Sequence, residues 1–250
     1  MNYPIYSYPS NTITGLVCDV IFLRQRVFRD DALACVSRLI PPLQVIHREN
    51  IPASGGYVIT VNHYYRASFA AQWMAIAVSS IVPMDIHWII TGELTFPDKW
   101  YAPLGMPVSR FILKRGARVY GFTAMPPMPP RPRDVEARAA SIRAVLDYAK
   151  QTKEPIIGLA PEGGDQVGGQ LTMPIPGAGR FGLLLASRGL KFAPVGVYES
   201  DGELCLHFGE VYDLSISRNL SSDEKDKQAA QIMMEHIAAL LPSNLRGEFT

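Results

Sequence analysis

Short apolar runs alternate with amphipathic stretches from residue 43 onward, and this alternation restricts the fold more than any other feature. Strands are expected at 43–47, 57–61, 86–90, 156–159, 192–197 and 204–208. Helices are expected between and after them, at 68–80, 107–118, 134–151, 180–187 and from 221 to 242. Apolar strands separated by helices predict an α/β fold, with a mixed, mostly parallel sheet flanked by helices on both faces.

The first forty residues have a different character. Residues 13–40 show helical spacing and carry several arginines, and Pro41-Pro42 ends the unit. We therefore expect an N-terminal helical segment at 1–42 and an α/β domain at 43–250. Two interpretations of 13–40 stay open. A basic amphipathic helix is typical of a peripheral membrane contact, and equally of a helix docked on its own domain with the basic face in solvent.

Composition excludes several classes of protein. With 48% hydrophobic residues and a net charge of +1, the 250-residue chain is neither disordered nor basic enough to indicate a nucleic-acid partner. The cysteines have no metal-binding spacing, so we expect no metal and three reduced, buried thiols: Cys18, Cys35 and Cys205. The first fourteen residues do not resemble a secretory signal, and 67–84 is too polar for a membrane span. The expected location is the cytoplasm, with the inner face of the membrane as an alternative.

Two polar motifs follow expected strands. Asn62-His63 comes after 57–61, and Pro161-Glu162-Gly163-Gly164 turns off the end of 156–159. Because the carboxyl ends of parallel strands meet at one edge of a sheet, we expect His63 and Glu162 to share a site. An imidazole has a suitable pKa to take a proton from a hydroxyl group. A carboxylate behind the ring would fix its tautomer and stabilise the imidazolium.

These motifs, in this order and spacing over about residues 40–215, resemble those of the glycerolipid acyltransferase family. The first family motif is Asn-His-x-x-x-x-Asp, and the third is Phe-Pro-Glu-Gly-Thr-Arg-Ser. A late Pro-Val-x-Val strand is matched by 194–197, and 91–105 is similar to the start of the family's middle block. Ser68 stands where the family has its aspartate, and Gly164-Asp165-Gln166 replaces Thr-Arg-Ser.

The resemblance implies an O-acyltransferase of phospholipid biosynthesis. It would move a fatty acyl group from acyl-CoA or acyl carrier protein, as co-substrate, to a lysophospholipid or glycerol-phosphate hydroxyl, without a further cofactor. His63 would be the general base and Ser68 a weak orienter of its ring. The resemblance implies that Glu162 binds the acceptor. Independently of it, Gly163 and Gly164 offer backbone N–H groups to an anion, and Arg66 in the His63 turn is the preferred phosphate candidate. Arg115 and Arg118 are candidates to pair with a phosphate of the acceptor or of coenzyme A, and a solvated helix face is the alternative for both.

Two departures from the family motifs motivate alternative hypotheses, and the first is Ser68. Removing the orienting carboxylate of a hydrolytic triad lowers the rate about 10⁴-fold. The chain would then be a catalytically lapsed member that binds acyl lipid or acyl donor without turnover, unless Asp85 or Asp165 supplies the missing charge. The altered third motif also leaves open an acyltransferase with a non-lipid acceptor.

Overall fold

The computed structural model describes residues 3–96, 99–164, 169–217 and 219–249. Across these ranges one seven-stranded sheet has the order β1-β7-β6-β2-β5-β3-β4. Its strands are β1 (Gln44–Ile46), β2 (Tyr57–Val61), β3 (His87–Thr91), β4 (Thr123–Met125), β5 (Ile156–Leu159), β6 (Lys191–Ser200) and β7 (Glu203–Phe208). The helices are α1 (Ser10–Phe22), α2 (Phe28–Val36), α3 (Gln72–Ile81), α4 (Ala102–Tyr120), α5 (Val135–Gln151), α6 (Ala178–Ala186) and α7 (Ser222–Ala238).

The sheet is mixed and mostly parallel, as the sequence predicted. All neighbouring pairs run parallel except β6 and β7, which are antiparallel. The strands β2 and β5 lie side by side in the middle, with Thr60 opposite Leu159. Every residue of these two strands is buried, which is why each reads as an uninterrupted apolar run.

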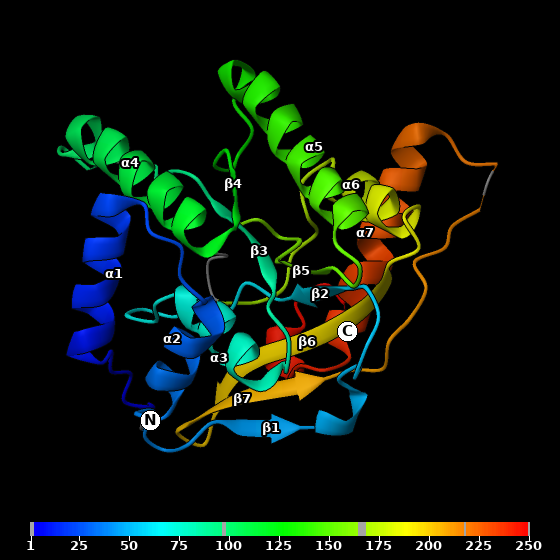
Figure 1. Cartoon of the computed structure of the whole chain (residues 1–250). Helices are drawn as coiled ribbons and strands as arrows, with labels where there is room; N and C mark the ends of the chain where they lie inside the picture. The colour runs from blue at the N-terminus through cyan, green and yellow to red at the C-terminus, as the bar shows by residue number, and fades with distance from the viewer. Residues whose placement is uncertain (1–2, 97–98, 165–168, 218, 250) are drawn as a thin grey trace.

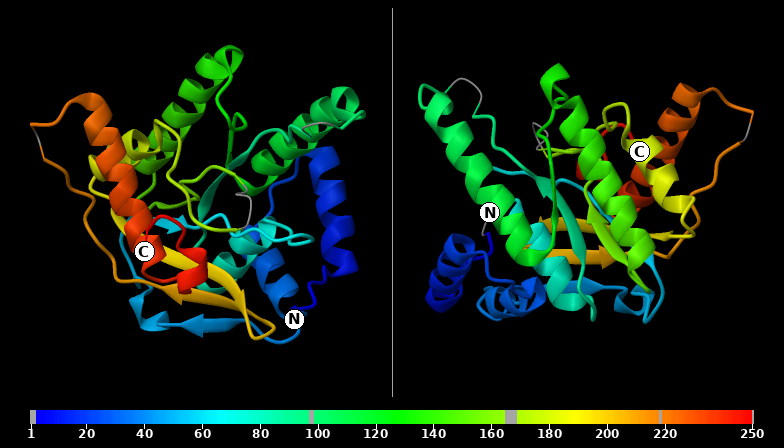
Figure 2. Two further views of the ribbon diagram at one scale, coloured as in Figure 1. Left: turned by 180° about the vertical axis from the view of Figure 1, so that it is seen from behind. Right: turned by 45° about the horizontal axis from the view of Figure 1, so that its top comes forward.

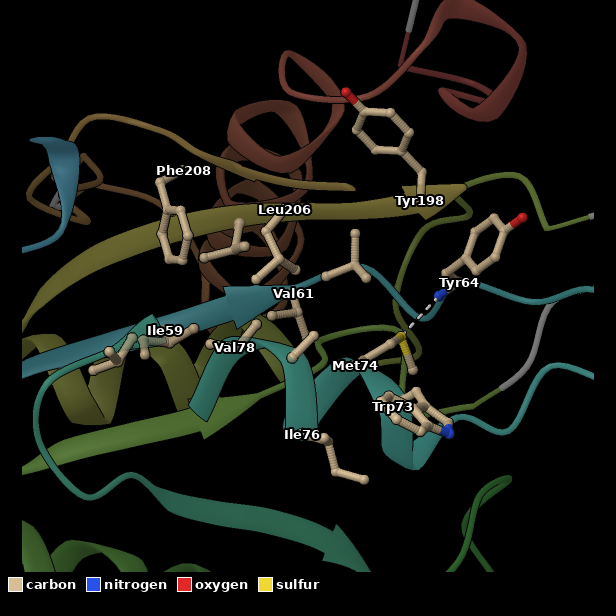
Figure 3. Packing of buried hydrophobic residues seen from close by; sticks show 14 of the residues in the cluster. Ile59, Val61, Tyr64, Trp73, Met74, Ile76, Val78, Tyr198, Leu206 and Phe208 are labelled. Atoms are coloured by element: carbon tan, nitrogen blue, oxygen red, sulfur yellow. Dashed lines mark hydrogen bonds between the residues drawn. The ribbon is translucent and has the colours of Figure 1, made fainter. Parts of the chain in front are cut away.

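Two hydrophobic cores cover the two faces of the sheet. Along β2, Tyr57, Ile59 and Val61 point into the core beneath α2 and α3, whereas Val58 faces the core beneath α5, α6 and α7. Figure 1 shows these two groups of helices on opposite sides of the sheet. Figure 3 shows the first core, where the Tyr64 backbone N–H donates to the Met74 sulfur at 3.2 Å. Because successive side chains of β2 point to opposite faces of the sheet and all of them are buried, helices must cover both faces.

The N-terminal segment differs from expectation. The predicted helix 13–40 is broken into α1 and α2, because Leu23 adopts a φ of +52° that ends α1. Arg26 fixes the connection by donating to Asp19 at 2.8 Å and to Asp31 at 2.6 Å. Cys35 and Cys205 are buried and free, but the prediction for Cys18 was wrong, since its thiol lies on the exposed side of α1.

Three other elements differ from expectation. The helix α3 begins at Gln72 rather than 68, because Ser68 has a φ of +70° that is incompatible with a helical turn. The helix α4 begins at Ala102, ahead of the expected 107. The edge strand β4 was not expected; it ends at Met125, directly before the prolines that cannot donate to a sheet. The capping box of α7, Ser221 with Glu224, is confirmed.

Candidate active site

The His63 and Glu162 motifs meet at the carboxyl edge of the sheet. His63 follows β2 and Glu162 follows β5, and these two strands are parallel neighbours. The His63 backbone N–H donates to Glu162 Oε2 at 2.7 Å. Glu162 is buried, whereas the His63 side chain is half-buried. Residues 99 positions apart are thus joined by a direct bond. The sequence motifs predicted that the two residues lie close together, but not that the backbone of His63 makes the contact.

Two further contacts stabilise the loops that follow β2 and β5. Glu162 Oε1 accepts the Thr172 backbone N–H at 3.2 Å. Gly169, with a φ of +70°, passes so close to Tyr65 that a Cβ on it would lie 2.5 Å from the Tyr65 carbonyl oxygen. Burial raises the pKa of the Glu162 carboxyl, although the bonds from His63 and Thr172 and the nearby His63 ring lower it. The Glu162 carboxylate therefore ties both ends of its loop to the His63 loop.

Asn62 fixes the backbone immediately before the histidine. Its Nδ2 donates to the Val197 carbonyl at 2.8 Å, and its Oδ1 accepts the Val197 N–H at 2.7 Å. The side-chain amide thus pairs with β6 as another peptide group would. Because Asn62 is buried, both bonds form out of water, and the imidazole one residue later has a defined starting point.

Arg66, predicted to bind phosphate, is paired with a carboxylate of its own chain. Its guanidinium donates to both oxygens of Glu199 at the end of β6, with Nη2 at 2.8 Å from Oε1. Tyr64 and Tyr6 donate hydroxyl hydrogen bonds to the same carboxylate at 3.0 and 2.5 Å. Burial, then the Glu199 bond and charge, raises the pKa of the Tyr6 phenol, so it stays protonated as a donor. The Arg66–Glu199 pair holds the loop after His63 against β6.

The glycines after Glu162 form the turn that the sequence indicated. Gly163 has a φ of +74°, which favours glycine, and Gly164 follows it in the same bend. A Cβ on Gly163 would lie 3.1 Å from the Met128 side chain, in the proline-rich loop after β4. Arg138 of α5 supports that loop by donating to the Pro127 carbonyl at 2.9 Å. The proline-rich loop is therefore packed directly on the Glu162 turn.

The remaining predicted residues are dispersed. Ser68 is exposed, five residues beyond His63. Arg115 and Arg118 lie on α4, and Arg115 Nη1 donates to the Ile21 carbonyl at the end of α1, at 3.4 Å. Asp85 precedes β3 and lies at the amino edge of the sheet, so about 20 Å of strand length separates it from His63. It does not orient the imidazole, and Asp165 lies outside the described residues.

A buried carboxylate near the same edge was not anticipated. Glu93 follows β3 and accepts hydrogen bonds from Arg110 at 2.5 Å and Arg131 at 2.7 Å. Burial raises the pKa of Glu93, but the two guanidinium groups together hold it below its ordinary value. Position at a strand end was the available signal, and the same signal would have identified Glu199. Neither carboxylate has a neighbour in sequence that reveals its arginine partners.

Two further features of the described residues bear on the kind of site. Within that part of the chain, no group of three or more histidine, cysteine, aspartate or glutamate side chains is placed to hold a metal ion. In the same ranges, no helix has the length and hydropathy needed to cross a bilayer.

The fold is that of a known lipid acyltransferase. The structure is similar to the crystal structure of the 1-acyl-sn-glycerophosphate (LPA) acyltransferase PlsC from Thermotoga maritima, with a TM-score of 0.50. The similarity covers 93% of this chain and 84% of that chain, at 13% sequence identity. No family model and no curated protein sequence matches the chain. At this identity the comparison establishes a shared architecture of helices and sheet.

Proposed function

We propose that the protein is an O-acyltransferase that moves a fatty acyl group from a thioester donor to a hydroxyl of a lysophospholipid or glycerol phosphate. The hydrogen bond between the His63 backbone and Glu162 carries this proposal, because it joins the two acyltransferase-like motifs at one sheet edge. The architecture shared with an LPA acyltransferase supports the same reaction class. The donor in this proposal is acyl-CoA or acyl carrier protein.

The proposed chemistry requires one base. The His63 imidazole accepts the proton of the acceptor hydroxyl as the hydroxyl oxygen attacks the thioester carbonyl carbon. Collapse of the tetrahedral intermediate breaks the carbon–sulfur bond, and the departing thiolate takes the proton back from the imidazolium. The Gly163 N–H donates to the Ala160 carbonyl at 3.1 Å within its own turn, so it is not assigned to the intermediate's oxyanion.

Glu162 and Ser68 have separate proposed roles. Glu162 positions the histidine, since its carboxylate already accepts the His63 and Thr172 backbone N–H groups. Each carboxylate oxygen retains a lone pair that can accept a bond from an acceptor hydroxyl. Ser68 supplies at most a neutral hydrogen bond to the imidazole, so catalysis is expected to be slower than with an aspartate there.

The single change at Ser68 favours one rival, a lapsed protein that binds acyl lipid or donor without turnover. Mass spectrometry distinguishes the two after incubation with acyl-CoA or acyl carrier protein and a panel of acceptors. The panel contains lysophosphatidic acid, glycerol 3-phosphate and hydroxyl compounds without phosphate. The proposal predicts a new ester on a phosphorylated glyceride. Donor binding without any ester product would establish the lapsed protein, and esters confined to other acceptors would refute the lipid assignment.

A further inference from the structure

The helix α4 exposes a continuous apolar stripe. Leu104, Val108, Phe111 and Ile112 recur at one-turn and two-turn spacing, and Leu104 is 75% exposed. Ser109 and Ala117 project from other sides of α4 and are buried, and Val119 is buried where the helix ends. The helix is therefore held in the fold by these residues and presents an apolar face to the outside.

The neighbouring helix α1 extends this exposed surface. Ile13, Val17 and Ile21 recur every four residues along α1, and all three are about half exposed. Arg115 of α4 joins the helices by donating to the Ile21 carbonyl. Figures 1 and 2 show α1 and α4 as neighbours at the same corner of the molecule. We call the exposed faces of these two helices, with Leu104, Val108, Phe111, Ile13, Val17 and Ile21, the α1/α4 surface.

The charges beside this surface have one sign. The helix α4 contains four basic residues and no acidic residue. At 3.6 residues per turn, Lys114 and Arg118 project from the side of α4 next to the apolar stripe. Among the described residues, neither side chain has an ion-pair partner. The Arg115 guanidinium lies over the Phe111 ring, 4.8 Å from the ring centroid. This cation–π contact keeps a third positive charge beside the apolar stripe.

The combination fits a lipid surface better than a protein surface. Apolar side chains flanked by unpaired cations match the acyl chains and anionic headgroups of a bilayer, which meet within one helix diameter. Trp100 lies just before α4 and is 90% exposed. An indole there fits the boundary between headgroups and acyl chains, where tryptophan is enriched.

We propose that the α1/α4 surface is the docking site for an anionic lipid bilayer. The apolar stripe enters the interface, and Lys114 and Arg118 contact lipid phosphates. The surface differs from the expected 13–40 contact, because α2 packs on α3 and α4 lies beside α1 in its place. This inference goes beyond the proposed activity, since docking requires neither His63 nor turnover.

Cosedimentation with vesicles tests the proposal. The wild-type protein is expected to bind vesicles of phosphatidylcholine mixed with phosphatidylglycerol at least tenfold better than vesicles of phosphatidylcholine alone. The double variant Leu104→Glu/Phe111→Glu should lose tenfold or more of its binding to mixed vesicles. Lys114→Glu/Arg118→Glu should lose the preference for anionic lipid. All substituted side chains are exposed, and circular dichroism checks that each variant is folded.

Two controls separate this surface from general effects. Val135 is an exposed apolar residue on α5, so Val135→Glu should bind vesicles as the wild type does. His63→Ala should also bind normally, which keeps docking distinct from catalysis. Wild-type protein that ignores anionic vesicles, or a Leu104→Glu/Phe111→Glu variant that binds them fully, would overturn the proposal. A dimer in light scattering that this variant dissociates, without vesicle binding, would assign the surface to a second copy instead.

Discussion

At the scale of single residues, Asn62 shows how the histidine is positioned. Its side-chain amide makes two hydrogen bonds with the Val197 backbone, and these bonds continue the pairing of β2 with β6 past the end of β2. The sequence places Asn62 beside His63, and that much was visible. Nothing near Asn62 identifies Val197, which is 135 residues away, as its partner. The same holds for Arg66, whose partner Glu199 is 133 residues away.

Replacing Asn62 by alanine should destabilise the protein by about 2–4 kcal/mol, because the Val197 N–H and carbonyl both lose a buried partner. Chemical denaturation of the wild type and the variant measures this difference. Asn50→Ala is the matched control, since Asn50 makes one partly buried bond, to the Phe208 carbonyl. It should cost about 1 kcal/mol. Equal losses of unfolding free energy in both variants would show that the two Asn62 bonds stabilise the protein no more than the single Asn50 bond does.

Acid should destabilise the protein partly through His87. This histidine is stacked on Tyr148, and burial lowers its pKa to about 4. The unfolded chain binds this proton near pH 6.5 and the folded chain near 4. Stability therefore falls as pH drops through that window, by no more than about 3 kcal/mol from this group.

The variant His87→Phe tests this assignment, because it keeps an aromatic ring against Tyr148 and cannot titrate. The free energy of unfolding should fall less between pH 6.5 and pH 4 in the variant than in the wild type. Parallel pH profiles for the two proteins would mean that His87 titrates normally.

At the scale of elements, two helical glycines have opposite roles. On α6, a Cβ at Gly179 would lie 1.9 Å from the Asp226 carbonyl of α7, so the two helices pack backbone to backbone. Asp226 also accepts the N–H groups of Gly177 and Arg180, both at 2.6 Å. On α4, a Cβ at Gly116 would meet nothing within 4 Å.

Alanine at the two glycines should therefore change stability in opposite directions. Gly179→Ala must separate α6 from α7 and should cost about 2–3 kcal/mol. Gly116→Ala should gain about 0.5–1 kcal/mol, because it restricts the unfolded chain and meets no obstacle. Thermal or denaturant unfolding of both variants measures these shifts. A stable Gly179→Ala protein would contradict the close approach of α6 and α7.

Elements with strong local patterns were predictable, and those set by individual side-chain contacts or by strand pairing were not. The buried runs of β2 and β5 and the capping box of α7 are encoded locally. The break between α1 and α2 occurs at Leu23, whose φ is positive, and Arg26 fixes it by bonding to Asp19 and Asp31; periodicity reveals neither feature. The strand β4 is three residues long and forms by pairing with β3.

At the scale of the whole molecule, chain order alone could not give the strand order. The site exists because β2 and β5, a hundred residues apart, are parallel neighbours, so that His63 and Glu162 leave the sheet at one edge. The motif order indicated this pairing. The position of α4 beside α1 could not be predicted from the sequence. Its residues belong to neither hydrophobic core, so its apolar pattern does not show which part of the fold it packs against.

The most direct test of the account is the dependence of acyl transfer on His63. Initial rates are compared for the wild type, His63→Ala and His207→Ala, with acyl-CoA or acyl carrier protein as donor and lysophosphatidic acid as acceptor. His207 is a half-buried histidine on β7 that bonds to the Leu240 carbonyl, and it serves as the matched control. We predict transfer above the uncatalysed background for wild type and His207→Ala, and background transfer for His63→Ala. Transfer by His63→Ala at the wild-type rate would contradict the account.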